Sequence, residues 1–442
     1  MSAYSVTANR LQAYEHDPGP LAPVLGWVDE RFGPIRYFSG RRFQAPLPRW
    51  WVYHCQLARP LGEFFTDYDM SALGASLDPS QALLKALGEA VERYNCLNSL
   101  KMVEPVFEEM SPDNPLYGRF PICADFEQCS ASLKHPPTGK LTQVSVKYLA
   151  DDREILIPAS YVHMNFLPRP NEAVVAKSIT TGSAFHQDLF KAIWSGLLEC
   201  AERDAIMLTW WNRRPAARIV VDDSTGNADL AERIFLLKNA GLKPHLFDIS
   251  SDFNLPTVFC LLEGKSKPYW SAGASCSENP LAACSKAIDE AVMILGFQDD
   301  TALKREIPSF ENFDWIKTLH DRSELYLHWK NCHALDFLLQ TENVISEAEF
   351  CSRKRWRAAH NLLELRDFAR QMSEIGLTAL WSDLTIDDVK DLGYCIKVLV
   401  PEMVPLSVEH RESFLATPRL AKAAGKEVLS AQDINPYPHP FA

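Results

Sequence analysis

The 442-residue sequence has no run of about 18 apolar residues, and its first ten residues lack the charged start and apolar stretch of a secretory signal. Positive charge is also scarce, because the formal net charge is −12 and the pI is near 5.5. A chain of this kind lacks the basic field that nucleic acids and anionic membranes attract. We therefore expect a cytoplasmic protein that binds neither.

Paired cysteines are missing as well. The eleven cysteines include no Cys-x-x-Cys pair and no Cys/His cluster at zinc-finger spacing. We expect them to be small buried thiols in a reducing compartment.

The familiar nucleotide motifs are also absent. Gly264, Lys265 and Ser266 match the end of a P-loop, but Phe259 stands where its first glycine should be, and no Gly-x-Gly-x-x-Gly opens a helix. There is no Gly-x-Ser-x-Gly elbow and no His-Glu-x-x-His helix, which argues against an esterase and a zinc peptidase. Any ATP site in this chain must be of another kind.

What the sequence does contain is the composition of a globular protein, with 47% hydrophobic and 23% charged residues. We divide it into a lead-in segment, residues 1–65, and one catalytic domain, residues 66–442, that ends in a proline-rich tail. Strands are predicted at Trp51 to Ala58, Gln143 to Leu149, Ile219 to Asp223, His245 to Ile249, Thr257 to Leu262 and Ile396 to Val400. An amphipathic helix is predicted from Ala228 to Ala240, closed by Gly241.

Three further helices have start signals and carry charges inside an apolar pattern. The first begins with Asp78 as N-cap, followed by Pro79, and the third uses the same device at Asn279 and Pro280. The second begins near Asp188.

The charges on these helices form a repeated pattern. The spacing Glu-x-x-Glu-Arg occurs at Glu89, Glu92 and Arg93, and again 110 positions later at Glu199, Glu202 and Arg203. The third helix presents Lys286 and Glu290, four residues apart and so on one face. One such cluster could be a solvated face with an ion pair worth about 0.2–0.5 kcal/mol. Two clusters on helices with apolar flanks suggest instead a buried site whose carboxylates are compensated by a divalent cation and nucleotide phosphates.

The three helices, in this order, resemble the YcaO family. The segments that carry the resemblance are KALGEAVERY, TTGSAFHQDLFKAIWSGLLECAERDA, ACSKAIDEA and, near the C-terminus, SDLTIDDVKDLGYCIKVLVPEMVPL. The resemblance spans about residues 65 to 442. It implies an α+β fold with mixed and antiparallel sheets, in which ATP and Mg²⁺ lie among the helices without a P-loop.

On matching positions the resemblance also implies roles for individual residues. The implied ligands of metal and ATP are Glu89, Glu92, Glu199, Glu202 and Glu290. The implied phosphate contacts are Arg93, Arg203 and Lys286, and Gln187 is the implied nucleotide contact. His186, beside it, is expected to be structural.

The chain departs from the family pattern at several positions. Lys85 stands at a usual serine, Ala75 at a usual lysine, Lys191 at a frequent acid and Lys286 at a usual arginine. Lys286 keeps the charge without the bidentate fork. Lys191 leaves the number of bound ions open.

The tail selects one chemistry within the family. Pro436, Pro438 and Pro440 give a Pro-x-Pro-x-Pro ending, which in the family is characteristic of azoline-forming cyclodehydratases. There a Cys thiol or Ser/Thr hydroxyl of a ribosomally made precursor peptide attacks the preceding carbonyl, ATP phosphorylates the amide oxygen, and phosphate leaves. The implied role of the tail is to place the terminal carboxylate of Ala442 where it accepts a proton. An exposed tail whose prolines merely resist helix formation is the alternative.

The implied partners are the precursor peptide, a separate leader-peptide-binding protein and a second copy of the chain within a larger complex. In related systems a flavin dehydrogenase joins such an assembly. Two other functions stay open. One is a YcaO enzyme that makes thioamides or amidines, and the other is a non-catalytic, ATP-binding scaffold subunit.

Overall fold

The structure of the protein is a computed structural model that describes residues 16–43, 47–58, 70–120, 124–125, 139–172, 175, 179–221, 225–252, 255–297, 306–410, 412–413 and 417–441. Its helices are α2 (Pro79–Asn98), α3 (Leu189–Trp211), α4 (Ala228–Asn239), α5 (Pro280–Phe297), α6 (Leu319–His328), α7 (Asp336–Leu339), α8 (Glu347–Ser352), α9 (Leu362–Glu374) and α10 (Pro418–Ala423). No helix in this described part of the chain is long and apolar enough to cross a membrane.

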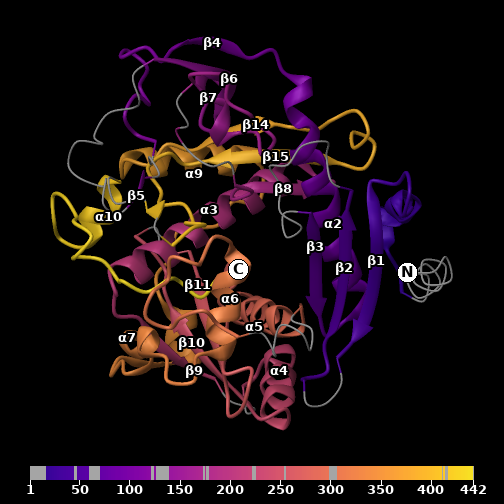
Figure 1. Ribbon diagram of the computed structural model, residues 1–442, viewed down its shortest axis with the longest axis vertical. Coiled ribbons are helices and arrows are strands. Elements are labelled where there is room, and N and C mark those ends of the chain that lie inside the picture. The colour runs from indigo at the N-terminus through magenta and orange to yellow at the C-terminus, as the bar shows by residue number, and fades with distance from the viewer. Residues whose placement is uncertain are drawn as a thin grey trace.

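The strands form mixed and antiparallel sheets, which confirms the expected α+β class (Figure 1). The first sheet has the order β1-β2-β3, built from β1 (Ile35–Arg42), β2 (Trp51–Leu57) and β3 (Ser71–Ser76). β2 is the strand predicted at Trp51, and it pairs with β3. The described strands of the lead-in, β1 and β2, therefore belong to the sheet on which α2, the first charged helix, packs.

The second sheet has the order β12-β11-β10-β9-β13. Its members are β9 (Ala217–Val220), β10 (Leu242–Asp248), β11 (Thr257–Gly264), β12 (Trp270–Cys276) and β13 (Val344–Ser346). Only its β13–β9 pair is parallel.

The third sheet has the order β4-β6-β14-β15-β8, and β7 pairs with β6. Its members are β4 (Val106–Glu109), β6 (Lys140–Tyr148), β7 (Glu154–Pro158), β8 (Ser183–His186), β14 (Leu380–Asp383) and β15 (Tyr394–Leu399). A short pair joins β5 (Ala124–Asp125) to β16 (Glu412–Ser413).

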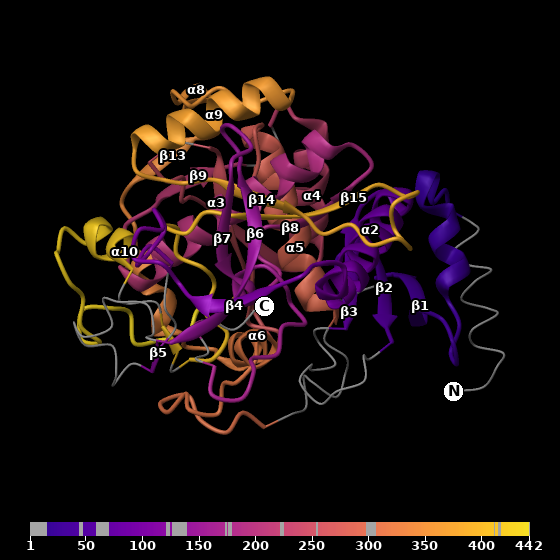
Figure 2. The same ribbon diagram turned by 90° about the horizontal axis from the view of Figure 1, so that it is seen from above.

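The three charged helices lie where these sheets meet. α2 packs on β2 and β3, α3 packs on β8 and β15 and also touches β12, and α5 packs on β11 and β12 and also touches β3. Figures 1 and 2 show all three in the interior of the molecule, with the C-terminus beside α6 near the centre. Each helix can therefore present its charges to the space that the sheets enclose.

The start signals read from the sequence are correct. Asp78 accepts a hydrogen bond from Gln81 N (3.0 Å), Asp188 accepts from Lys191 N (2.9 Å), and Asn279 accepts from Leu281 N (2.9 Å). Each cap satisfies a backbone donor that the first helical turn leaves without a partner. α4 matches the fourth predicted helix, and Gly241 after it has φ +73°, which favours glycine.

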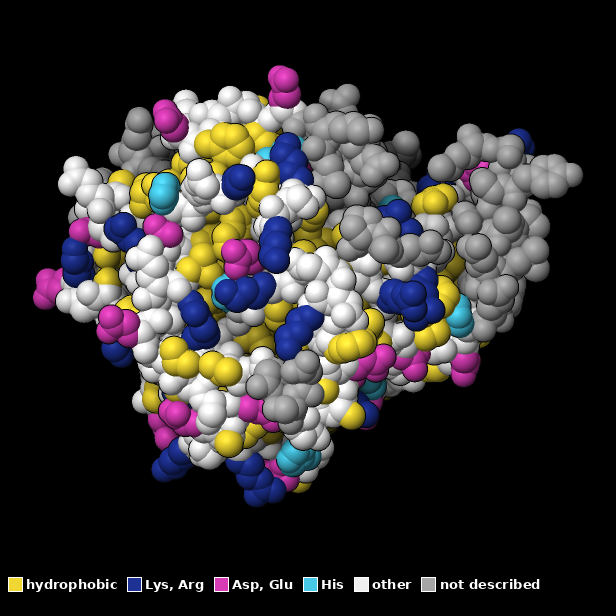
Figure 3. Space-filling view, turned by 90° about the horizontal axis from the view of Figure 1, so that it is seen from below, with side chains coloured by type: hydrophobic (Ala, Val, Ile, Leu, Met, Phe, Trp, Pro, Cys, Tyr) yellow, Lys and Arg dark blue, Asp and Glu magenta, His cyan; other side chains and the backbone are white. Residues whose placement is uncertain are grey.

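The described cysteines are free thiols, as expected. All are buried except Cys351. On the face shown in Figure 3, Lys and Arg side chains gather around a central hydrophobic area, and most acidic side chains lie toward the edge of the view.

Candidate active site

The structure brings the glutamates of the two repeated clusters and of α5 into one group. Four of them accept a hydrogen bond from a backbone N–H of a neighbouring strand or of the turn before it. The donors and acceptors are Leu73 N and Glu89 (2.8 Å), Gly182 N and Glu199 (3.0 Å), Ala274 N and Glu290 (2.6 Å), and Cys276 N and Glu202 (2.9 Å). Each carboxylate is thus fixed by a strand as well as by its helix.

Two of the three units are built alike. In β3–α2 the N–H of Leu73 reaches the carboxylate 16 residues later, and in β12–α5 the N–H of Ala274 does the same over 16 residues. Both helices begin with a capping side chain and a proline. The site therefore consists of strand–turn–helix units whose glutamates point inward.

The arginines of the clusters neutralise part of this charge. Arg93 contacts Glu89 through Nε (2.9 Å) and Nη2 (2.8 Å). Arg203 lies between two carboxylates, 3.3 Å from Glu202 and 3.7 Å from Glu199. All these side chains are largely buried.

The carboxylates repel one another in a poorly solvated space. Burial, and then the charges of Glu199 and Glu89, raise the pKa of Glu92 well above its usual value. Burial and the nearby Glu290 raise the pKa of Glu202 to about 8, although Arg203 opposes the shift. Burial likewise raises the pKa of Glu199 and of Glu290. A cation at this place would relieve a real electrostatic penalty.

A further charged group, Lys397, was missed in the sequence. It lies on β15, is 2% exposed, and donates to Ile179 O (2.6 Å) and, more weakly, to Ser183 Oγ (3.5 Å). Its charge acts on both Glu92 and Glu199. One charge within the apolar run YCIKVLV was the signal that could have identified it.

Full ionisation of the five carboxylates would leave charge unbalanced within the protein. Five negative charges would face the positive charges of Arg93, Arg203 and Lys397, which is an excess of two. Yet within the described residues no three His, Cys, Asp or Glu side chains are close enough together to hold a metal ion by themselves. The donors at the site are carboxylate oxygens, which suit Mg²⁺, and phosphate oxygens and water would complete its octahedron.

The comparisons with known proteins agree with this geometry. The family model described as YcaO cyclodehydratase, ATP- and Mg²⁺-binding, matches residues 73–404. The chain belongs to the YcaO family. ATP and Mg²⁺ are therefore its cofactors, and the matched region contains all five glutamates.

Solved structures share the fold. A heterocyclase in complex with substrate and cofactor has a TM-score of 0.72 at 19% identity over 96% of this chain and 57% of that one. The microcin synthetase McbBCD complex of E. coli has a TM-score of 0.61 at 15% identity, over 93% and 99%. YcaO from Methanopyrus kandleri, bound with AMPPCP and Mg²⁺, has a TM-score of 0.55 at 17% identity, over 84% and 86%. This chain spans little more than half the length of the heterocyclase.

Two further residues that the YcaO pattern singles out are Lys286 and Gln187. Lys286 is exposed on α5, one turn before Glu290, and Gln187 is exposed between β8 and α3. No described hydrogen bond or ion pair joins either side chain to the carboxylates, so their contacts with the nucleotide stay predictions. His186 accepts from Asp188 N (2.9 Å), which is the structural role expected for it.

The departures at Ala75 and Lys85 prove to be neighbours in space. The ammonium of Lys85 donates to the carbonyl of Ala75 (2.8 Å) and contacts Asp289 (3.4 Å). Asp289 is buried and also accepts from Arg233 Nε (2.9 Å) and Trp50 Nε1 (2.8 Å). Lys85 on α2 thus places its ammonium beside Ala75 on β3, the position at which the family pattern has a lysine. Lys191 is exposed in the first turn of α3.

The proline-rich tail is packed into the molecule. Tyr326 donates to Pro438 O (2.5 Å), Trp210 donates to Tyr437 O (2.9 Å), and Phe441 is 1% exposed. The alternative of an exposed tail is therefore wrong for residues 438–441, which are buried, whereas Pro436 is exposed. Ala442, with the terminal carboxylate, lies outside the described residues.

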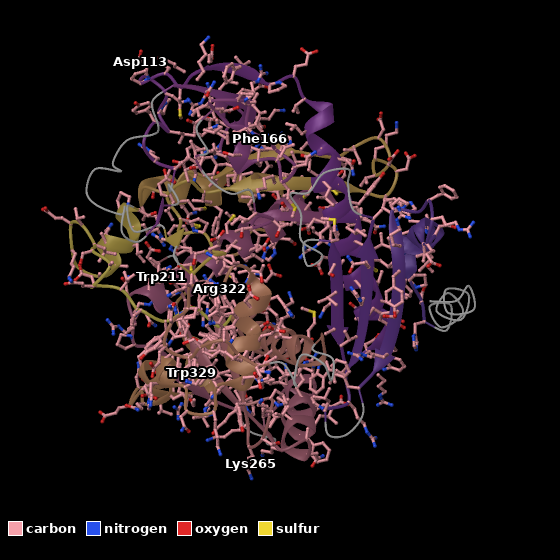
Figure 4. The ribbon with its side chains drawn as sticks, in the orientation of Figure 1. Asp113, Phe166, Trp211, Lys265, Arg322 and Trp329 are labelled. Carbon is pink, nitrogen blue, oxygen red and sulfur yellow. The ribbon has the colours of Figure 1, made fainter. Side chains whose placement is uncertain are left out.

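The tail ends near the carboxylate cluster. Burial, and then the charges of Arg322 and Arg203, hold the pKa of His439 well below its usual range. Arg322, labelled in Figure 4 near the centre of the molecule, comes from α6, and Arg203 belongs to the cluster. The last described residues therefore approach the site from the side of α6.

Proposed function

We propose that this protein is an ATP-dependent cyclodehydratase that converts Cys, Ser or Thr residues of a ribosomally made precursor peptide into azolines. The observation that carries the proposal is the gathering of Glu89, Glu92, Glu199, Glu202 and Glu290 on three interior helices, with a proline-rich tail, buried over residues 438–441, that runs up to it. The heterocyclase fold supports it.

The proposed roles of the site residues follow from their charges. The five glutamates would be ligands of Mg²⁺ and ATP, with no more than two of the described ones at one ion and with phosphate oxygens completing the coordination. Arg93, Arg203 and Lys286 would contact phosphate oxygens, with Gln187 at the nucleotide. When bound, Mg-ATP supplies the phosphoryl group that turns a poor leaving group, the amide oxygen, into a good one. Arg203 lies between Glu199 and Glu202, where Mg-ATP would bind. From there its guanidinium would offset negative charge that develops beside the reacting amide.

The tail is what favours azoline formation over other chemistry of the family. Tyr326 and Trp210 donate to the carbonyls of Pro438 and Tyr437, so this part of the tail is held in place. We propose that Pro436, Pro438 and Pro440 position the Ala442 carboxylate as a proton acceptor for the attacking thiol or hydroxyl.

We further propose that the chain works as a homodimer in a cytoplasmic complex with a separate leader-peptide-binding protein. The fold shared with the E. coli McbBCD complex supports a multisubunit assembly. A flavin dehydrogenase in that assembly would oxidise azolines to azoles.

The test is to incubate the protein with Mg-ATP, the precursor peptide encoded beside its gene and the adjacent partner protein, and to follow peptide mass and phosphate release together. A loss of about 18 Da per residue, coupled to phosphate release and abolished by Glu199→Ala, is expected. A gain of about 16 Da when sulfide is supplied would assign thioamide formation instead. ATP binding without any change in mass or phosphate would favour the scaffold subunit.

A further inference from the structure

A pocket of about 80 Å³ lies between α3 and the chain that follows β15. Its walls are mostly apolar and include Val400, Met403 and Val404. Phe120 and Tyr161 close another side as a stacked ring pair, with centroids 4.4 Å apart. Such a lining favours an apolar occupant.

Among the described residues, the charged members of the lining are Arg203 and Lys397. Arg203 is the residue that contacts Glu199 and Glu202, so the pocket borders the carboxylate cluster. Lys397 is almost fully buried and contributes a charge to a cavity with apolar walls. Its ammonium has three donors and, in the described structure, two acceptors within 3.5 Å. The pocket therefore combines apolar walls with donors suited to a carbonyl oxygen.

The size of the pocket limits its occupant. A cavity of about 150 Å³ takes a benzene ring, and this pocket has about half that volume. An aliphatic side chain matches this volume more closely than a large aromatic one such as that of Trp. The donors at Arg203 and Lys397 would then face the backbone carbonyl of the same residue.

From this geometry we propose that the pocket receives the side chain of the substrate residue immediately before the modified Cys, Ser or Thr, and that this residue is aliphatic. The inference rests on the proposed cyclodehydratase function, in which the carbonyl of that preceding residue is attacked. Holding its side chain among Val400, Met403 and Val404 fixes the carbonyl beside Arg203, next to the carboxylates that would hold Mg-ATP. The pocket thus selects which peptide bonds react.

Photo-crosslinking tests the assignment without requiring turnover. The probe is the capped peptide acetyl-Gly-Gly-X-Cys-Gly-Gly-amide, where X is a leucine analogue that carries a diazirine, offered with Mg-AMPPCP. We expect crosslinks on Tyr161, Met403 or Val404, found by peptide mapping, and competition by the Leu peptide but not by its Trp counterpart. Crosslinks confined to other surfaces, or none, overturn the proposal. Labelling blocked by isocaproate but not by the Leu peptide also overturns it, because the pocket would then take a free aliphatic acid.

This readout separates the two hypotheses. Crosslinks in the pocket without water loss or phosphate release would keep the pocket and refute the cyclodehydratase. Water loss with crosslinks elsewhere would keep the cyclodehydratase and refute the pocket.

A pair of variants adds a functional check. Met403→Phe narrows the pocket, and Met372→Phe makes the same change at a buried methionine of the same core cluster that does not line it. We expect Met403→Phe to lower pocket crosslinking by at least about tenfold, with Mg-AMPPCP binding retained as evidence of an intact fold. Equal losses in both variants would show a general packing effect and count against the proposal.

Discussion

Four of the five glutamates of the site serve two opposing purposes. The hydrogen bond that each accepts from a backbone N–H fixes its carboxylate in place, whereas its charge repels the other carboxylates until a cation arrives. Because the amide of glutamine still accepts the backbone bond but carries no charge, Glu→Gln separates the two contributions.

We predict that Glu202→Gln weakens Mg-AMPPCP binding by about 10- to 100-fold while it stabilises the ligand-free protein at pH 8. Titration calorimetry and chemical denaturation measure the two effects. Glu172→Gln is the control, since Glu172 also accepts from a backbone N–H, that of Thr142, outside the cluster. Loss of binding together with loss of stability would contradict the prediction.

Lys85 yields a second prediction at this scale. If its ammonium stands in for the lysine that the family pattern has at position 75, then Lys85→Ser should lower Mg-AMPPCP affinity, and Ala75→Lys/Lys85→Ser should restore much of it. Ala75 is 3% exposed, so unfolding curves must accompany the binding data. A double variant that folds yet binds no better than Lys85→Ser would refute the exchange.

The residues that the sequence could reveal were those with a repeated spacing. Glu89 and Glu199 stood out because the same motif occurs twice on helices with clear start signals. Lys397 and Asp289 did not, because the groups that make them important come from segments more than 50 residues away. No local pattern contains that information.

At the scale of elements, the strands that donate to the glutamates were the hardest to foresee. β12 has the sequence WSAGASC and is buried along its whole length, so its small residues show neither alternation nor a hydrophobic run. β3, SALGAS, is similar. Small residues are required on β3 and β12 because α2 and α5 pack directly on the backbones of these strands.

Gly273 on β12 makes this requirement testable. A Cβ at this position would lie 2.4 Å from Ala287 O and 2.4 Å from Ala291 N of α5, a contact with backbone that side-chain motion cannot relieve. We predict that Gly273→Ala moves α5 off β12, costs about 1–3 kcal/mol of unfolding free energy and weakens Mg-AMPPCP binding, because Ala274 N then no longer meets Glu290.

Gly226→Ala is the matched control, since nothing lies within 4 Å of a Cβ there. Denaturation curves and calorimetry measure both variants. If Gly273→Ala left both stability and binding unchanged, the close approach of α5 to β12 would not be what positions Glu290.

At the scale of the whole molecule, the site exists because three sheets converge on three helices. The sequence indicated the three charged helices, α4 and six of the strands, but sheet order depends on pairings such as β15 with β8, whose members lie about 200 residues apart. The resemblance to a known family supplied the fold where periodicity could not. The tail illustrates the same limit, since its prolines showed that it is not helical but not that Phe441 is buried against Phe259.

The converging helices also make the stability of the ligand-free protein depend on pH. Folding raises the pKa of Glu202 from 4.5 to about 8, and it raises the pKa values of Glu92, Glu199 and Glu290 as well. Between these values the folded state binds more protons than the unfolded state, so stability falls as pH rises. Buried histidines act in the opposite sense, but below about pH 6.5, where the unfolded imidazole gains its proton.

We therefore predict that the unfolding free energy of the ligand-free protein falls by at least about 1 kcal/mol from pH 7 to pH 8. Denaturation curves at the two values measure it. Glu202→Gln should reduce the fall because it removes a carboxyl whose pKa folding raises to about 8, and Mg-AMPPCP should reduce it because a bound cation favours the ionised carboxylates. A fall that is identical in the variant and in the presence of Mg-AMPPCP would place its origin outside the carboxylate cluster, and with it the argument that these glutamates await a divalent cation would fail.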